Sequence, residues 1–247
     1  MNKIKQFIAK EWTLCKTLFS SIPAVVTTLF VLSVVFMNIF ASVALVQLNW
    51  LALDAGILLS WLSFLTMDIV CKRYGAKAAN ILTAFAIILN LVCIGFFNII
   101  RGIIALTPDW NGWISEVFVV LSGDWKTLLS SMVAMMVAAI VNNLINVTLK
   151  KAFAKKNETG FKEFAVASYA STMIGQFVDN FVFAFFAHII FNIWGHPLTL
   201  IQILMFAVTG AIVELLCEVV FSPLGFKISK KWEKEGKGNE YLELLNK

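Results

Sequence analysis

Long apolar segments, separated by short polar and basic stretches, make up most of the chain. Six of them approach the ~20 residues that a helix needs to cross a bilayer. We predict these segments at Pro23–Leu48, Ala55–Tyr74, Ala78–Ile100, Lys126–Leu149, Phe164–Asn192 and Leu198–Val220. The second segment is the weakest, because Cys71-Lys72-Arg73-Tyr74-Gly75 interrupts it early, and a broken or re-entrant helix is the alternative there.

Shorter segments surround this core. Residues 1–22 place lysines on one helical face and apolar residues on the other, which predicts an interfacial amphipathic helix. The apolar positions are Ile4, Phe7, Ile8, Cys15, Leu18 and Phe19. The transmembrane domain then covers residues 23–226, and the lysine-rich residues 227–247 predict a charged cytoplasmic tail. In the long third loop, helical spacing predicts one further interfacial helix at Ile114, Val117, Phe118 and Leu121.

Composition agrees with a membrane protein. The 247 residues are 60% hydrophobic and 14% charged, with a mean hydropathy of +0.83. Soluble domains average about 45–50% apolar and about 25% charged residues, so a soluble helical protein is disfavoured. The chain is long enough for one membrane domain without a separate soluble one.

The basic residues predict the orientation. Of the 20 lysines and arginines, eighteen lie in the two termini and in the second and fourth loops, which share one side of the membrane. The other two lie at the margins of the third loop, on the opposite side. The positive-inside rule therefore predicts an all-α integral protein of the cell (inner) membrane, with six transmembrane helices and both termini cytoplasmic. This distribution explains the net charge of +5 without a nucleic-acid partner.

The order of the segments allows an internal symmetry. The first three segments start from the cytoplasmic side of the membrane, and the second three start from the outer side. Two inverted three-helix halves are therefore one possible arrangement, as in many transporters. Asp68 lies in the middle segment of the first half and Asp179 in the middle segment of the second. No residue-by-residue repeat accompanies these positions, so coincidence explains them equally well.

Polar residues inside the apolar segments are the candidate substrate-binding residues. A carboxylate within a bilayer costs a few kcal/mol or more, so it normally faces a cavity or a partner in the protein. The candidates are Asp68, Asn142, Gln176, Asp179, Asn180, Glu214 and Glu218. Two alternatives stay open: Asp68 could form an ion pair with Lys72 at the inner interface, and the asparagines could form interhelical hydrogen bonds.

The sequence contains neither HExxH nor GxSxG, and no cysteine or histidine spacing resembles a metal site. We therefore expect no enzyme activity, no metal and no cofactor. An intramembrane aspartyl protease is disfavoured, because Phe177-Val178 precedes Asp179 where such enzymes carry Gly-x-Gly. ATP hydrolysis by the chain is not expected, since no nucleotide-binding motif is present.

Three motifs carry a family resemblance. The stretch Phe64-Leu65-Thr66-Met67-Asp68-Ile69-Val70-Cys71-Lys72-Arg73-Tyr74-Gly75-Ala76 resembles the acid-to-aromatic-glycine motif of the queuosine precursor transporters, also called the vitamin uptake transporter family. Ala170-Ser171-Thr172 through Gly175 to Asp179 resembles the fifth-helix motif, and Glu218-Val219-Val220-Phe221-Ser222-Pro223-Leu224 resembles the final-helix signature. The resemblance implies import of 7-deazaguanine precursors of queuosine, or of queuine, for tRNA modification.

One departure from the family concerns Lys72 and Glu214. Many members carry an acid at the first position and a base near the second, so the signs are reversed here. A Lys72–Glu214 ion pair between the second and sixth segments would preserve the interaction. A changed substrate is the other explanation.

The expected partners are a deazapurine and the lipid bilayer. A guanine-like ring presents adjacent N–H donors that one carboxylate can accept together, and aromatic side chains can stack on its faces. Trp61, Tyr169 and Phe183 are candidates for stacking. A substrate-binding subunit of an energy-coupling-factor vitamin transporter, and a channel or structural membrane protein, are the alternatives, and a homo-oligomer is left open.

Overall fold

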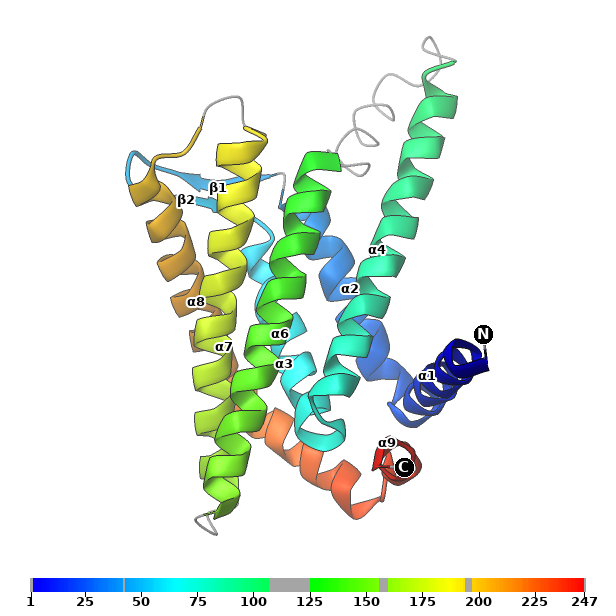
Figure 1. Cartoon of the computed structure of the whole chain (residues 1–247). Helices are drawn as coiled ribbons and strands as arrows, with labels where there is room; N and C mark the ends of the chain where they lie inside the picture. Colours follow the sequence, from blue (N-terminus) through cyan, green and yellow to red (C-terminus); the bar gives the residue numbers. More distant parts are fainter. Residues whose placement is uncertain (1, 42, 107–124, 156–159, 194–196, 247) are drawn as a thin grey trace.

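The computed structural model describes residues 2–41, 43–106, 125–155, 160–193 and 197–246. Within these ranges the chain forms a helical bundle with one small hairpin at its end (Figure 1), so the predicted all-α class is confirmed. The elements are α1 (Asn2–Ser21), α2 (Ala24–Phe40), β1 (Ala44–Gln47), β2 (Ala52–Asp54), α3 (Ile57–Tyr74), α4 (Ala76–Ile104), α6 (Trp125–Lys155), α7 (Phe161–Ala184), the π-helix η2 (Phe185–Ile190), α8 (Leu200–Lys234) and α9 (Asn239–Asn246). The interfacial helix predicted around Ile114–Leu121 lies outside the described residues.

Four described helices are long and apolar enough to cross a membrane. They are Ala76–Ile104, Trp125–Ala154, Phe161–Ile190 and Leu200–Lys234. Counting α1 and α2 together as one bent segment raises the number to five, so the predicted count of six is not confirmed. The α3 helix is unbroken from Ile57 to Tyr74, but Asp68, Lys72 and Arg73 reduce its apolar character.

The first predicted segment, Pro23–Leu48, was wrong at its carboxyl end. Helix α2 stops at Phe40, and Ala44–Gln47 forms strand β1, which pairs antiparallel with β2. The turn is tight, since the Leu48 amide donates to the Leu51 carbonyl over 2.7 Å. Apolar content alone does not separate a short apolar strand from the end of a helix, which is why the error arose.

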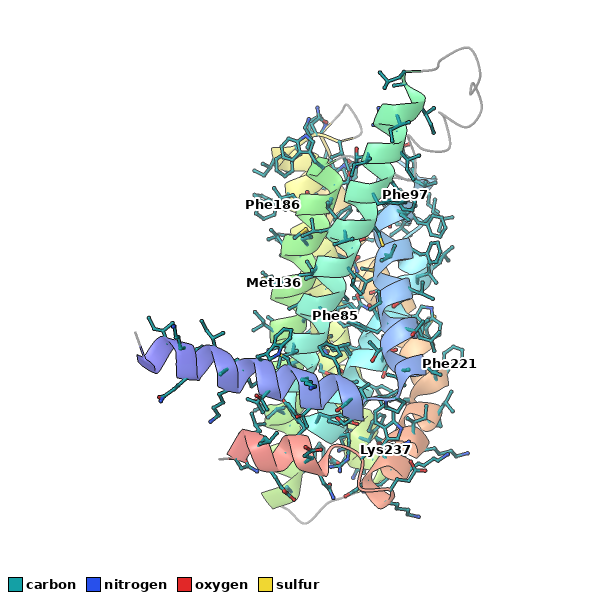
Figure 2. All side chains as sticks on the ribbon, turned by 90° about the vertical axis from the view of Figure 1, so that its right-hand side faces the viewer. Phe85, Phe97, Met136, Phe186, Phe221 and Lys237 are labelled. Atoms are coloured by element: carbon teal, nitrogen blue, oxygen red, sulfur yellow. The ribbon has the colours of Figure 1, made fainter. Side chains whose placement is uncertain are left out.

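A sharp bend separates α1 from α2. The two helices meet at 104° across Pro23. Proline disfavours helical backbone in the residue before it, so α1 ends at Ser21 and α2 starts afresh. Figure 2 shows α1 lying across the end of the bundle that also carries α9. We call this the terminal end, and the opposite end, which carries β1 and β2, the hairpin end (Figure 1).

Helix α7 lies at the centre of the packing. It contacts α6 on one side and α8 on the other, while α3 packs on both α8 and α2. Gly175 permits the close approach to α6, because a Cβ there would lie 2.9 Å from Cβ of Asn142 and 3.1 Å from the Phe64 ring. Three helices therefore meet beside Gly175, which lies near the buried polar residues described below.

The outer surface of the bundle is apolar. Along α4, the side chains of Ile88, Val92, Phe96, Ile99 and Ile103 are each more than half exposed. Figure 2 shows further apolar side chains, such as Met136 and Phe186, on the bundle. An exposed apolar surface of this extent around a core rich in polar residues marks a multi-pass membrane protein.

Candidate functional site

One face of α7 is both buried and polar. Ser168, Ser171, Thr172, Gln176 and Asp179 have at most 8% of their surface exposed. Their spacing places them along one side of the helix, because residues three and four apart are neighbours. Since α7 lies between α6 and α8, this face carries polar groups along the inside of the bundle.

Near Ser168, the carboxylate of Asp68 accepts hydrogen bonds from two helices, α6 and α7. Its Oδ1 accepts a hydrogen bond from Asn142 Nδ2 of α6 at 2.7 Å. Its Oδ2 accepts from Ser168 at 2.7 Å, and from Ser171 and Thr172 at the longer distances of 3.3 and 3.4 Å. These donors satisfy both oxygens of a side chain that is fully buried.

Glu218 of α8 joins the same group. Its Oε1 lies 2.5 Å from Ser168 Oγ, so Ser168 stands between two acids. The Glu218 side chain is fully buried, and its Oε2 has no hydrogen-bond partner among the described groups. We call this set the Asp68 cluster; its members are Asp68, Asn142, Ser168, Ser171, Thr172 and Glu218.

A small cavity lies nearer the hairpin end, and its volume is about 30 Å³. It is lined by Met37, Ala41, Asp54, Gly56, Ile57, Ser60, Ser131, Ala134, Asp179, Asn180, Phe183 and Glu214. Three carboxyl groups therefore converge on one space from β2, α7 and α8. We call it the hairpin-side cavity.

Two side chains fix the position of Glu214 in this cavity. Ser60 of α3 bonds its Oε1, and Asn180 Nδ2 of α7 lies 3.4 Å from its Oε2. Gly210 makes room for Asn180, because a Cβ at this position of α8 would lie 2.4 Å from Asn180 Nδ2. Asp179 differs from Glu214, since its Oδ1 has no partner in the described structure.

Asp54 is a cavity residue that the sequence interpretation missed. It lies between the predicted segments Pro23–Leu48 and Ala55–Tyr74, outside the apolar segments that supplied the candidate residues. In the structure Asp54 belongs to β2 and is buried, and its Oδ1 accepts from the Gly56 amide at 2.8 Å. Burial in the hairpin raises the pKa of this carboxyl to about 7. Only the unexpected hairpin brings Asp54 to the cavity, so no local sequence signal could have identified it.

Neither of the two ion pairs left open for Lys72 forms. Lys72 pairs with Glu163 at the start of α7 instead of with Asp68 or Glu214. Asp68 is turned toward Asn142 and Ser168, and Glu214 lies toward the hairpin end with Ser60 and Asn180. Lys72 and Glu214 therefore have separate partners and form no ion pair with each other.

The seven candidate residues fall into two groups. Asp179, Asn180 and Glu214 line the hairpin-side cavity, whereas Asp68, Asn142 and Glu218 belong to the Asp68 cluster. Gln176 lies between the two levels on α7; it is fully buried, and neither atom of its amide has a partner among the described groups. The sequence did not identify Ser168 and Ser60, because serine in a helix carries no distinct signal.

Of the three aromatic candidates, only Phe183 lines the cavity. Trp61 stacks on Phe221 with ring centroids 4.5 Å apart, and the Tyr169 hydroxyl lies 2.7 Å from Ser222 Oγ. The described residues contain no group of three or more His, Cys, Asp or Glu side chains that could hold a metal ion.

An apolar-surfaced bundle with buried acids in its interior defines a multi-pass membrane transporter. The family model described as "Putative vitamin uptake transporter" matches residues 54–227, and the chain belongs to this family. No curated protein and no solved structure matches the chain. The matched residues run from Asp54 into α8, so they include the Asp68 cluster and the residues that line the hairpin-side cavity, except Met37 and Ala41. Membership in a transporter family supports the expectation that the chain is not an enzyme.

Proposed function

We propose that this chain imports a 7-deazaguanine precursor of queuosine, or queuine, by alternating access. The observation that carries the proposal is the hairpin-side cavity, where Asp179, Glu214 and Asn180 converge beside Phe183. The resemblance of the motifs around Asp68, Asp179 and Glu218 to queuosine precursor transporters supports this choice of cargo within the vitamin uptake family.

The chemistry of the cavity suits such a base. Asp179 Oδ1 is buried without a partner among the described groups, so the carboxylate can accept hydrogen bonds from the adjacent N–H groups on one edge of a guanine-like ring. A good bidentate contact of this kind discriminates by about 1–3 kcal/mol. Asn180 can donate to or accept from the same ring, and Phe183 offers an aromatic face. We assign direct contact with the substrate to Asp179, Asn180 and Glu214.

The size of the cavity supports alternating access. A volume of about 30 Å³ holds little more than one or two water molecules. Small-molecule sites commonly enclose about 300–1,000 Å³. Binding a deazapurine therefore requires α7 and α8 to separate from α3, which opens the space between Asp179 and Ser60.

The other four candidates have a different place in the proposal. Asp68, Asn142 and Glu218 tie α3, α6, α7 and α8 together below the cavity, and Gln176 lies between the levels. We propose that this bonded group changes partners when the site opens, so that these residues control the transition and do not hold the base.

Complementation tests the proposal. The chain is expressed in cells that can neither make nor import queuosine precursors, and 7-aminomethyl-7-deazaguanine or queuine is supplied. Restored queuosine in tRNA is the expected result, with an Asp179→Asn variant at equal expression giving less. No restoration with either compound, despite good membrane expression, would contradict this cargo. Restoration only with added energy-coupling subunits would support the substrate-binding-subunit alternative.

A further inference from the structure

Ser168 makes two short contacts that its single hydroxyl proton cannot satisfy alone. Its Oγ lies 2.7 Å from Asp68 Oδ2 and 2.5 Å from Glu218 Oε1. A serine hydroxyl donates one hydrogen bond, and an ionised carboxylate only accepts. If both acids were ionised, one of these contacts would be two acceptors facing each other. At least one of the two acids therefore carries a proton and donates it to Ser168.

The surrounding donors place that proton on Glu218. Asp68 has the environment of an anion, since Asn142 Nδ2 and the Ser168 hydroxyl each donate to it at 2.7 Å. The Thr172 hydroxyl lies 3.4 Å from Oδ2, and the Ser171 hydroxyl, which also lies 3.0 Å from the Ser168 carbonyl, is 3.3 Å away. Glu218 has the environment of a neutral acid. Among the described residues its carboxyl group is hydrogen-bonded only to Ser168, and its Oε2 is buried without a partner. An ionised group with so little compensation would be costly to bury. The protonated Glu218 therefore donates a hydrogen bond to Ser168, and the Ser168 hydroxyl donates to Asp68.

No counter-ion replaces this proton among the contacts of the described residues. The titratable groups near the pair come from each packed helix. They are Asp68, Cys71 and Lys72 of α3, Lys150 of α6, Glu163 and Tyr169 of α7, and Glu214 and Cys217 of α8. Lys72 is paired with Glu163, and Lys150 Nζ donates to the Lys72 carbonyl at 2.8 Å. Tyr169 bonds Ser222.

The pair is also connected to the hairpin-side cavity. Glu214 lies four residues before Glu218 on α8, so the two carboxyl groups stand on one helical face, and both are fully buried. On α7, Gln176, whose amide has no partner among the described groups, lies between Thr172 of the Asp68 cluster and Asp179 of the cavity. A movement of Glu214 when the cavity is occupied would therefore be transmitted to Glu218, one turn further along α8.

We propose that Glu218 is the proton-binding group of a proton-coupled importer, and that Ser168 links it to Asp68. The inference rests on the proposed transport function and adds its coupling ion. When the Glu218 proton passes to Ser168 Oγ, the Ser168 proton passes to Asp68. Glu218 is then a carboxylate, Asp68 a carboxylic acid, and Ser168 again a hydroxyl. One proton has moved across the pair with no net change in charge.

Infrared spectroscopy of the purified protein tests the proton itself without any substrate. The difference spectrum of wild type minus Glu218→Gln at neutral pH is expected to contain the carbonyl band of a protonated carboxyl. The matched control is Glu243→Gln, an exposed acid of α9, whose difference spectrum should lack the carbonyl band of a protonated carboxyl. The bands of the new glutamine amide are common to both difference spectra. If the Glu218 difference is that of an ionised carboxylate, the proposal is overturned, whatever the transport measurements give.

Transport in proteoliposomes then tests the coupling. The probe is labelled 7-aminomethyl-7-deazaguanine, with the membrane potential clamped at zero. An inward gradient of one pH unit is expected to raise accumulation by up to about tenfold in wild type, if one proton accompanies each substrate. Glu218→Gln should exchange labelled for unlabelled substrate but show no response to the gradient. Ser168→Ala should respond less than Ser168→Thr, which keeps the hydroxyl.

The outcomes separate the two proposals. Exchange by wild type without any response to the pH gradient would overturn the coupling and leave the transport function standing. A response to a sodium gradient alone would also overturn it. Absence of exchange by wild type, with the protonated Glu218 present in the infrared spectrum, would contradict the transport function while supporting the proton site.

Discussion

Asn180 Nδ2 of α7 lies 3.4 Å from Glu214 Oε2 of α8, in the space that Gly210 leaves open. This contact joins two helices that both line the hairpin-side cavity. It orients the Glu214 carboxyl, whose other oxygen is bonded by Ser60 of α3. Three helices therefore share one carboxylate, and a small change on any of them would move the site.

Gly210→Ala tests this arrangement. The new Cβ would lie 2.4 Å from Asn180 Nδ2, so the flexible end of the asparagine must move away from Glu214. We expect substrate affinity to fall by up to about tenfold, the effect of losing one hydrogen bond of about 1 kcal/mol, with little change in thermal stability. The control is Gly95→Ala on α4, where a Cβ meets nothing within 4 Å. Equal affinity in both variants would contradict a role for Asn180.

Asp179→Asn tests direct recognition of the substrate. The amide keeps the shape of the side chain but cannot accept two hydrogen bonds from the edge of the base. We expect binding to weaken by about 1–3 kcal/mol, roughly ten- to a hundredfold. A purely structural role predicts instead a neutral or stabilising effect, because an uncharged amide costs less to bury in a membrane. Affinity and thermal stability measured on the same purified variant distinguish the two roles.

The Lys72–Glu163 pair is expected to stabilise the terminal end of the bundle. Their side chains are only 12% and 9% exposed, so removing one partner leaves a largely buried charge. We expect Glu163→Gln to lower the free energy of unfolding by about 3 kcal/mol, measured by denaturation in detergent. The matched control is Glu11→Gln, which breaks the more exposed Lys77–Glu11 pair and should cost at most about 1 kcal/mol. If the two variants lost similar amounts of unfolding free energy, the more buried Lys72–Glu163 pair would not contribute more to stability than the exposed pair.

Cysteine labelling tests the orientation predicted from the basic residues. Leu106 follows α4 at one end of the bundle, and Lys151 lies in the last part of α6 at the other end. Both side chains are exposed. In a background without Cys15, Cys71, Cys93 and Cys217, we expect a cysteine at position 151 to react only from the cytoplasm and one at position 106 only from outside. Labelling of both from the same side would refute the orientation.

The sequence alone was sufficient for the class of protein and for most of its helices. The segments around α4, α6, α7 and α8 are recognisable from local composition. The thickness of the bilayer sets the length of apolar sequence that a spanning helix needs. The candidate residues were also local signals, because a carboxylate or amide in an apolar segment is conspicuous by its cost. Gln176, Asp179 and Glu218 could be named on this ground before any contact was known.

The tertiary structure decided which of these residues lie together. Lys72 pairs with Glu163 over a separation of 91 residues, and Ser168 meets Glu218 over a separation of 50. Neither contact follows from local spacing, since it depends on which faces of α3, α7 and α8 pack together. The hairpin of β1 and β2 likewise brings Asp54 into the cavity, because an apolar segment after a helix can form strand or helix equally well by composition. Composition determined what must be buried, and packing determined which buried groups meet.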